Sequence, residues 1–212
     1  MPLVAFDFDG TLTDDEMTVA LGEQAGVAED MIEITERAMN DEIDYAASLR
    51  ERVSLLEGLE GDAVKTAFET IELREGMPAL LAELQAADVK LAILTGGFER
   101  GVRLLLERHD ITVDALVANQ LGVENRTLTG EVDGPLVEGT KDVALRAIVT
   151  ELGETFGETA AVGDGANDIA MIQAAGVGIG FRPKPAVEPE CDVIVHSVDE
   201  LRNALRENGF LA

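Results

Sequence analysis

Residues 3–13 read LVAFDFDGTLT, an apolar run that leads into two aspartates and a glycine. Residues 3–8 are mostly apolar, which predicts a strand buried on both faces, as in a parallel sheet. Asp7 interrupts this run, and a buried carboxylate needs a cation, hydrogen-bond donors or a place at the strand end. Asp9 has the same strand parity and Gly10 permits a tight turn, so both carboxylates are expected at one ligand site.

Two neighbouring carboxylates repel each other unless a proton or a metal ion separates them. Mg²⁺ suits Asp7 and Asp9, because it takes oxygen ligands and often binds through one or two carboxylates plus a phosphate. The alternative is a strand that ends in an Asp-rich turn without a ligand. This pair of residues alone does not decide between the two.

The chain has 212 residues, of which 46% are hydrophobic, enough for one domain or a domain with an insert. No run approaches 18 apolar residues, so no transmembrane helix is expected. No basic segment followed by an apolar stretch starts the sequence, so we expect no signal peptide and a cytoplasmic protein. Cys191 is the only cysteine, which excludes an intrachain disulfide and favours a half-buried structural thiol.

The formal net charge is −26, from 42 acidic and 16 basic residues. Such a charge repels nucleic acids and anionic membranes, so we expect neither as a partner. The acidic residues are spread along the chain, which is typical of a folded protein in a salt-accumulating, halophilic cell where salt screens the repulsion. The sequence leaves the oligomeric state open, with a homodimer as one option.

Residues 14–75 carry apolar residues at helical spacing with no intervening strand, which predicts four helices inserted after the first strand. From residue 77 onward, predicted strands alternate with predicted helices. This alternation indicates an α/β fold built on a three-layer parallel sheet. We therefore expect a core formed by residues 1–13 and 76–212, with residues 14–75 as a small helical domain.

Two further predicted strands also end in polar, glycine-containing loops. Residues 89–94 lead into Thr95–Gly97, and residues 159–162 lead into Gly163–Asp168. If these strands are neighbours of the first strand, all three loops meet at one crevice. Lys141, at the start of a predicted helix, would add a cation to the carboxylates, hydroxyl and backbone N–H groups. That combination suits a phosphate site in which one carboxylate attacks.

Four motifs, in order along nearly the whole chain, resemble the signature of the haloacid dehalogenase superfamily. They are Asp7-x-Asp9-Gly10-Thr11, Thr95-Gly96-Gly97, Lys141 and Gly163-Asp164-Gly165-x-Asn167-Asp168. The helical insert resembles the cap of the phosphoserine phosphatase family, in which Glu16 and residues 48–56 resemble substrate-binding positions. The resemblance implies a Rossmann-like core with a small four-helix cap inserted after the first strand.

The resemblance also implies a role for each motif residue in phosphoryl transfer. Asp7 would be the nucleophile that forms an aspartyl-phosphate. Asp9 would act as the acid for the leaving alcohol and then as the base for water. Asp164 would bind Mg²⁺ together with Asp7 and the backbone carbonyl of Asp9.

The other matched positions are implied to bind the substrate or to support the loops. Thr95, the Gly96 amide and Lys141 would hold the phosphoryl group. Asn167 would contact the substrate phosphate, and Asp168 would support the metal and its loop.

Within the cap, Glu16 is implied to take the ammonium group of the substrate, and Arg52 its carboxylate. Tyr45 and Met39 would either line the pocket as apolar walls or belong to the core of the cap.

Together these residues favour a Mg²⁺-dependent phosphoserine phosphatase that hydrolyses O-phospho-L-serine in L-serine biosynthesis. A phosphatase or phosphotransferase of the same superfamily for another small phosphate ester is the nearest alternative. A phospho-accepting signalling receiver is an alternative of another class, because receivers also combine strand-end aspartates, Mg²⁺, a threonine and a lysine. The cap and the acid–base position of Asp9 argue against it, because a receiver should keep its phosphate.

The net charge of −26 predicts that the folded state depends on salt. Repulsion among the carboxylates should be screened at salt concentrations on the order of 1 M, where the Debye length is about 3 Å. We therefore expect the melting temperature to rise from dilute buffer to concentrated KCl. A melting temperature that does not move with KCl would contradict this dependence.

Overall fold

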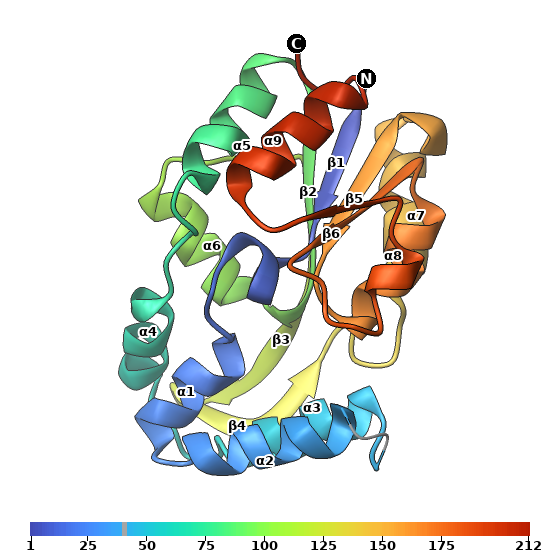
Figure 1. Ribbon diagram of the computed structural model, residues 1–212. Coiled ribbons are helices and arrows are strands. Elements are labelled where there is room, and N and C mark those ends of the chain that lie inside the picture. Colours follow the sequence, from blue (N-terminus) through green and yellow to red (C-terminus); the bar gives the residue numbers. More distant parts are fainter. Residues whose placement is uncertain (40–41) are drawn as a thin grey trace.

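The computed structural model of the protein describes residues 1–39 and 42–212. Its strands form one seven-stranded sheet in the order β4-β3-β2-β1-β5-β6-β7 (Figure 1). The strands are β1 (Leu3–Phe6), β2 (Lys90–Phe98), β3 (Ala115–Glu124), β4 (Thr127–Asp133), β5 (Thr159–Gly163), β6 (Val177–Phe181) and β7 (Val193–Val195).

Helices are found both between β1 and β2 and between the later strands. They are α1 (Met17–Ala25), α2 (Ala28–Met39), α3 (Tyr45–Ser54), α4 (Gly61–Thr70), α5 (Met77–Ala86), α6 (Glu99–Arg108), α7 (Lys141–Leu152), α8 (Ile169–Ala174) and α9 (Val198–Glu207). Among the described helices, none combines the length and the apolar character needed to cross a bilayer.

Strand β1 lies in the middle of the sheet, between β2 and β5. It runs parallel to both, with Leu3 paired to Lys90 on one side and to Thr159 on the other. All four residues of β1 are buried, because a strand that is covered on both faces requires an unbroken apolar run. Among the described strands only β4 runs antiparallel, against β3.

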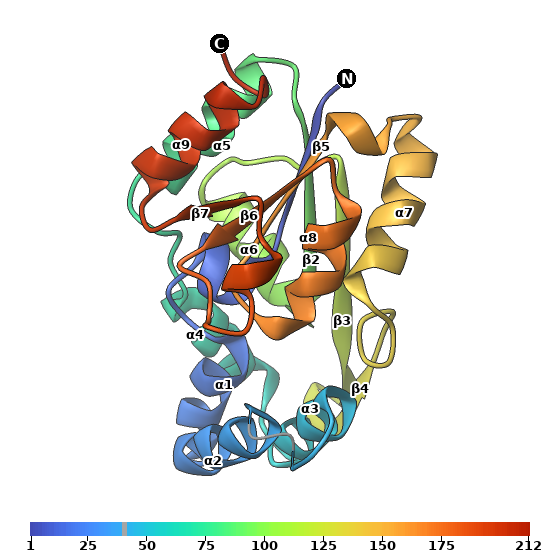
Figure 2. The same ribbon diagram turned by 45° about the vertical axis from the view of Figure 1, so that its right-hand side comes forward.

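Helices cover both faces of this sheet (Figure 2). Val4 and Phe6 of β1 belong to the apolar core shared with α5, α6 and α9, whereas Leu3 and Ala5 belong to the core shared with α7 and α8. Successive residues of a strand point to opposite faces, so this short run contributes to both cores. The predicted fold class, a three-layer α/β core with four helices inserted after the first strand, is confirmed.

Helices α1 to α4 lie toward the end of the molecule opposite the chain termini, and the β3–β4 hairpin reaches them (Figures 1 and 2). Main-chain hydrogen bonds join the hairpin to the loop between α3 and α4. The Gly58 N–H donates to the Leu128 carbonyl at 3.0 Å, and the Leu128 N–H donates to the Leu59 carbonyl at 2.9 Å. The Gly61 N–H donates to the Arg126 carbonyl at 2.7 Å. The insert is therefore attached to the core at a second place.

The predicted strand over residues 3–8 is too long, because β1 ends at Phe6. Residues Phe8–Leu12 instead form an irregular turn, in which Asp9 and Gly10 have non-helical main-chain angles and the Thr13 N–H donates to the Phe8 carbonyl at 3.1 Å. Gly10 adopts a φ of 82° inside this turn, a conformation that is strained for residues with a Cβ. Asp9 therefore reaches the crevice through a turn, and the strand-parity argument for its position is wrong.

Two other strands run further than predicted. β2 continues past residue 94 to Phe98. The sequence predicts separate short strands at 115–118 and 121–124, and the structure joins them into the single strand β3. The pairing of β2 with β3 shifts register between Leu94 and Phe98. Glycine is a poor strand former, so the Gly96-Gly97 pair predicted the end of a strand that the sheet in fact extends.

Candidate active site

The loops after β1, β2 and β5 meet at one edge of the sheet, because these three strands are neighbours. A cavity of about 420 Å³ lies there, between the sheet and helices of the insert. It is lined by eight of the residues with predicted roles, namely Asp7, Asp9, Glu16, Arg52, Thr95, Gly96, Asp164 and Asn167. Of the other two, Lys141 is ion-paired with Asp7 in the cavity wall, and Asp168 is ion-paired with Lys141.

This ion pair is part of a buried triad. The Lys141 ammonium group is paired with the Asp7 carboxylate and, at 2.5 Å, with the Asp168 carboxylate. All three side chains are buried. Burial by itself would lower the pKa of Lys141, but Asp168 and Asp7 outweigh it and raise that pKa. The ammonium group therefore keeps its charge at the first residue of α7, where the sequence predicted it.

Asp168 also holds the loop that follows β5. Its Oδ2 accepts hydrogen bonds from the backbone N–H groups of Asp164, at 3.0 Å, and Gly165, at 2.9 Å. A Cβ at Gly163 would lie 2.5 Å from the Asp168 side chain, so this position requires glycine. One carboxylate thus fixes both the ammonium group of Lys141 and the loop that carries Asp164.

Carboxylate oxygens of Asp7, Asp164 and Asp168 lie within 4.8 Å of one another, close enough to hold one metal ion. Burial raises the pKa of Asp7, Asp168 adds to this effect, and Lys141 opposes it. Burial also raises the pKa of Asp164. A buried excess of negative charge and a donor set made of oxygen atoms fit a hard divalent cation such as Mg²⁺.

Asp9 lies in the same cavity but in a different environment. Burial holds its pKa well above the usual range, and Glu16 and Asp7 raise it further. Its Oδ1 has no hydrogen-bond partner within the described part of the chain. A raised pKa favours the protonated form of a buried carboxyl group, and in that form the group can donate its proton to a leaving oxygen.

The end of β2 forms another wall of the cavity. Thr95 is buried, and its hydroxyl oxygen accepts a hydrogen bond from the Gly97 N–H at 2.9 Å. The Gly96 carbonyl accepts from the side-chain amide of Asn119 at 3.0 Å. A Cβ at Gly96 would lie 1.8 Å from the Tyr45 hydroxyl oxygen, so a side chain at this position would require the Tyr45 ring to move.

Glu16 and Arg52 reach the cavity from the insert. Glu16 immediately precedes α1, and Arg52 lies on α3. The Arg52 side chain is buried and donates from Nη1 to the Thr18 hydroxyl at 3.0 Å. Tyr45 also lines the cavity, whereas the Met39 side chain lies outside the described residues. The insert thus brings one acidic side chain, Glu16, and one basic side chain, Arg52, to the cavity, in addition to the groups around Lys141.

The sequence gave no prediction for Lys184, which lines the cavity beside Asp164. Its Nζ lies 3.3 Å from Asp164 Oδ2. Lys184 lies in the loop after β6, between two prolines and outside all four motifs. The scarcity of lysine in this acidic chain is the one signal that could have singled it out.

The sequence also gave no prediction for Arg74, which clamps the turn after β1. Its Nε donates to the Thr11 carbonyl at 2.9 Å and its Nη2 to the Gly10 carbonyl at 2.6 Å. The guanidinium group is ion-paired with Asp14 and lies 5.0 Å from the centre of the Phe181 ring. Arg74 lies in a loop without periodicity, so no sequence pattern pointed to these contacts.

Known proteins resemble this chain in both fold and sequence. The family model for haloacid dehalogenase-like hydrolases matches residues 4–173. The phosphoserine phosphatase of Halobacterium salinarum is 46% identical over 99% of this chain and 100% of that protein. That of Methanocaldococcus jannaschii is 37% identical over 96% of each protein. A solved phospho-aspartyl intermediate analogue of phosphoserine phosphatase has a TM-score of 0.89 at 36% identity, covering 97% of this chain and 98% of that one. A substrate-bound phosphoserine phosphatase complex has a TM-score of 0.89 at 35% identity, over 97% of each chain.

Replacing Arg74 with glutamine should destabilise the turn after β1, because two carbonyls lose charge-assisted hydrogen bonds. We expect the free energy of unfolding, measured with urea at constant KCl, to fall by about 2 kcal/mol. Arg103→Gln is the matched control, because the exposed Arg103 guanidinium pairs with Glu99 on its own helix. The control should change the free energy by less than about 0.5 kcal/mol. Equal losses in the two variants would contradict the clamp.

Proposed function

The chain belongs to the haloacid dehalogenase-like hydrolases and, within them, to the phosphoserine phosphatase family, and we propose that it hydrolyses O-phospho-L-serine to L-serine and phosphate. The observation that carries this proposal is the buried triad of Asp7, Lys141 and Asp168 beside a cavity into which Asp9 brings a second carboxyl group. One carboxylate next to a cation and one protonated carboxyl group are what a two-step phosphoryl transfer requires.

In the first step, we propose that an Asp7 carboxylate oxygen attacks phosphorus. The bond from phosphorus to the serine oxygen breaks, and an aspartyl-phosphate forms on Asp7. The leaving oxygen takes the proton of Asp9, whose raised pKa supports this role. In the second step the Asp9 carboxylate takes a proton from water, and the water oxygen attacks phosphorus. The bond from phosphorus to the Asp7 oxygen breaks, phosphate leaves, and Asp7 returns to a carboxylate and Asp9 to a protonated carboxyl group.

We propose that Mg²⁺ is held by the carboxylates of Asp7 and Asp164 and by the backbone carbonyl of Asp9. The ion would supply positive charge that neutralises the phosphoryl oxygens. The cluster of buried carboxylates around Asp7 supports this site. Asp168 supports it indirectly, because one of its oxygens binds Lys141 and the other fixes the loop of Asp164.

The phosphoryl group would be held by the Thr95 hydroxyl, the Gly96 amide and the Lys141 ammonium group. Thr95 and Gly96 line the cavity, and Asn167 lines it from the opposite loop, where it would contact the substrate phosphate. Backbone N–H groups and a buried ammonium group stabilise phosphoryl oxygens strongly, because little water competes for them.

We propose that Glu16 and Arg52 select the serine part of the substrate. Phosphoserine carries an ammonium group and a carboxylate, and the insert brings one acid and one base to the cavity. Arginine suits a carboxylate, because its planar guanidinium group can make two parallel hydrogen bonds. Residues 14–75 would then act as a cap that excludes water and strengthens both contacts.

The two alternatives have less support. A receiver would need to keep its phosphate, whereas Asp9 offers the acid and base that release it, and the family relatives are phosphatases. A small phosphate ester that lacks an ammonium group and a carboxylate would leave the charges of Glu16 and Arg52 without substrate partners.

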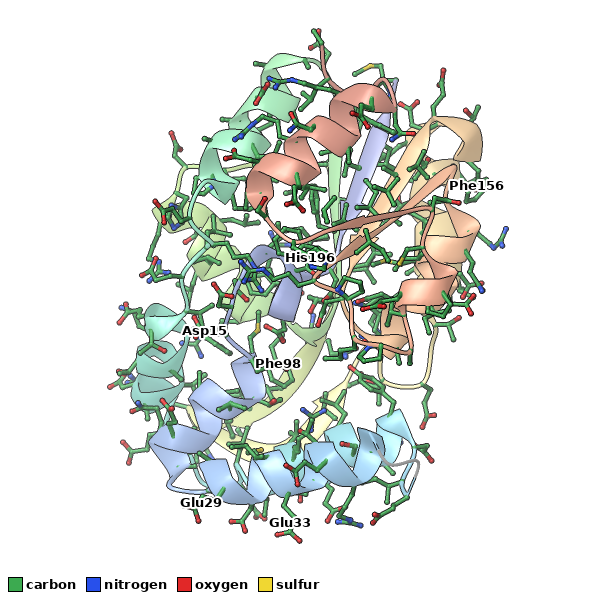
Figure 3. The ribbon with its side chains drawn as sticks, in the orientation of Figure 1. Asp15, Glu29, Glu33, Phe98, Phe156 and His196 are labelled. Carbon is green, nitrogen blue, oxygen red and sulfur yellow. The ribbon has the colours of Figure 1, made fainter. Side chains whose placement is uncertain are left out.

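We further propose that the enzyme works in L-serine biosynthesis in a salt-rich cytoplasm. Its acidic side chains support the salt-rich setting, since Glu29 and Glu33 on α2 point away from the body of the molecule (Figure 3). Exposed carboxylates of this kind repel one another and repel nucleic acids and anionic membranes, and concentrated salt screens that repulsion.

The two carboxyl roles can be separated with two variants. Asp7→Asn should abolish phosphoserine turnover, because an amide cannot form the acyl-phosphate. Asp9→Asn should lower kcat by about 10²–10⁴-fold on phosphoserine, but less on p-nitrophenyl phosphate, whose leaving group needs no proton. Asp15→Asn, which changes an exposed carboxylate outside the cavity, is the control. Activity near wild type in Asp7→Asn, or equal losses on both esters in Asp9→Asn, would contradict this mechanism.

Substrate selection can be tested with esters that lack one charge. Arg52→Ala should lower kcat/KM for phosphoserine by roughly 10²-fold, the loss expected for a charge-assisted contact of about 3 kcal/mol. It should affect phosphoethanolamine, which has no carboxylate, far less. Glu16→Gln should hurt substrates with an ammonium group and spare phosphoglycolate. If both variants lose activity equally on every ester, Glu16 and Arg52 are structural and phosphoserine is the wrong substrate.

A further inference from the structure

Lys184 makes two contacts with Asp164. Its side-chain Nζ lies 3.3 Å from Asp164 Oδ2, and its backbone N–H donates to the Asp164 carbonyl at 2.9 Å. Pro183 and Pro185 flank it and restrict its main chain. The backbone of Lys184 is therefore fixed beside the loop of Asp164, while the ammonium group sits at the end of a flexible four-carbon stem.

The position of the side chain leaves that ammonium group room to move. The Lys184 side chain is 44% exposed, whereas that of Asp164 is 12% exposed. Lys184 thus lies at the mouth of the cavity and reaches inward to a carboxylate that is largely covered. Glu16, a second acid that lines the cavity, faces the same region. Burial would lower the pKa of Lys184, but Asp164 and Glu16 outweigh it and raise that pKa.

The ammonium groups of Lys141 and Lys184 pair with different carboxylates of the site. Lys141 is ion-paired with both Asp7 and Asp168, and its side chain is only 3% exposed. Asp164 pairs instead with Lys184. A bound divalent cation would bring two positive charges to the same carboxylate. Like charges at such short range repel, so Lys184 and the metal ion compete for Asp164.

We propose that Lys184 is a resident counter-ion of the metal site, holding the Asp164 carboxylate in the metal-free protein and moving off it when a divalent cation binds. The inference rests on the metal role proposed above for Asp164. The freed ammonium group has a second carboxylate within the same cavity, that of Glu16. Lys184 therefore stabilises the metal-free site and weakens metal affinity.

This competition predicts whether the affinity for the metal ion rises or falls when the Lys184 ammonium group is removed. Removing the ammonium group should tighten metal binding, because the metal no longer displaces it. If Lys184 merely oriented Asp164 for the metal, its removal would weaken binding. The pair is partly exposed, so we expect a gain in affinity of roughly threefold to fivefold, as for an ion pair of modest strength.

The test uses Mn²⁺, which accepts the same oxygen ligands as Mg²⁺ and whose free form is counted by electron paramagnetic resonance. Lys184→Met removes the charge and keeps the length of the stem, and Lys184→Arg keeps the charge. Lys65→Met is the matched control, because Lys65 is similarly exposed and lies 3.5 Å from Glu69 on a cap helix. Each protein is loaded with Mn²⁺ at constant KCl and titrated with a chelator, so variants that are unstable without metal are also measured.

Lys184→Met should bind Mn²⁺ roughly threefold to fivefold more tightly, whereas Lys184→Arg and Lys65→Met should stay near wild type. The melting temperature of the chelated protein should fall in Lys184→Met, which widens the gap between the metal-free and metal-loaded forms. Unchanged or weaker Mn²⁺ binding in Lys184→Met would overturn the counter-ion role. Asp164→Asn separates the two proposals, because Mn²⁺ binding that survives this change would refute the metal site itself.

Discussion

A buried ammonium group is stable only when carboxylates surround it, and the core of this protein satisfies that requirement for Lys141. Its partner Asp7 follows β1, its partner Asp168 follows β5, and Lys141 itself begins α7. The three can meet only if β1 and β5 are neighbours and α7 packs on the face that they share. The same arrangement requires glycine at position 163, because a side chain there would displace Asp168. The strand order and the chemistry therefore depend on one another.

The same cluster gives its carboxyl groups different states. Asp7 has a cation beside it, and Asp164 has Lys184 at the mouth of the cavity. Asp9 has neither, its Oδ1 lacks a hydrogen-bond partner among the described residues, and burial holds its pKa well above the usual range. Neighbouring carboxyl groups in different surroundings can have different pKa values, and one site can then provide both a nucleophile and an acid.

The sequence predicted those parts of the site that local rules determine. Polar, glycine-containing loops at strand ends located Asp7, Thr95 and Asp164, because parallel strands bring their carboxyl ends to one edge. It failed where the main chain departs from regular structure, as at Asp9, which is placed by an irregular turn rather than by strand parity. No motif or periodicity pointed to Arg74 and Lys184, because their contacts join separate segments of the chain, and only the scarcity of lysine marked Lys184.

The attachment of the insert limits how the cap can move. Glu16 stays close to the core, because the chain enters the insert there, whereas Arg52 lies on α3, next to the loop that bonds to the β3–β4 hairpin. If residues 14–75 closed as the proposed cap in one rigid unit, three main-chain hydrogen bonds between residues 58–61 and the hairpin would break, unless the hairpin moved as well. Those bonds cost free energy to break, so the hairpin and the cap should move together. The pairing of β2 with β3 is irregular between Leu94 and Phe98, so the strand that carries the Thr95–Gly97 wall of the cavity is not bonded to β3 by a continuous ladder there.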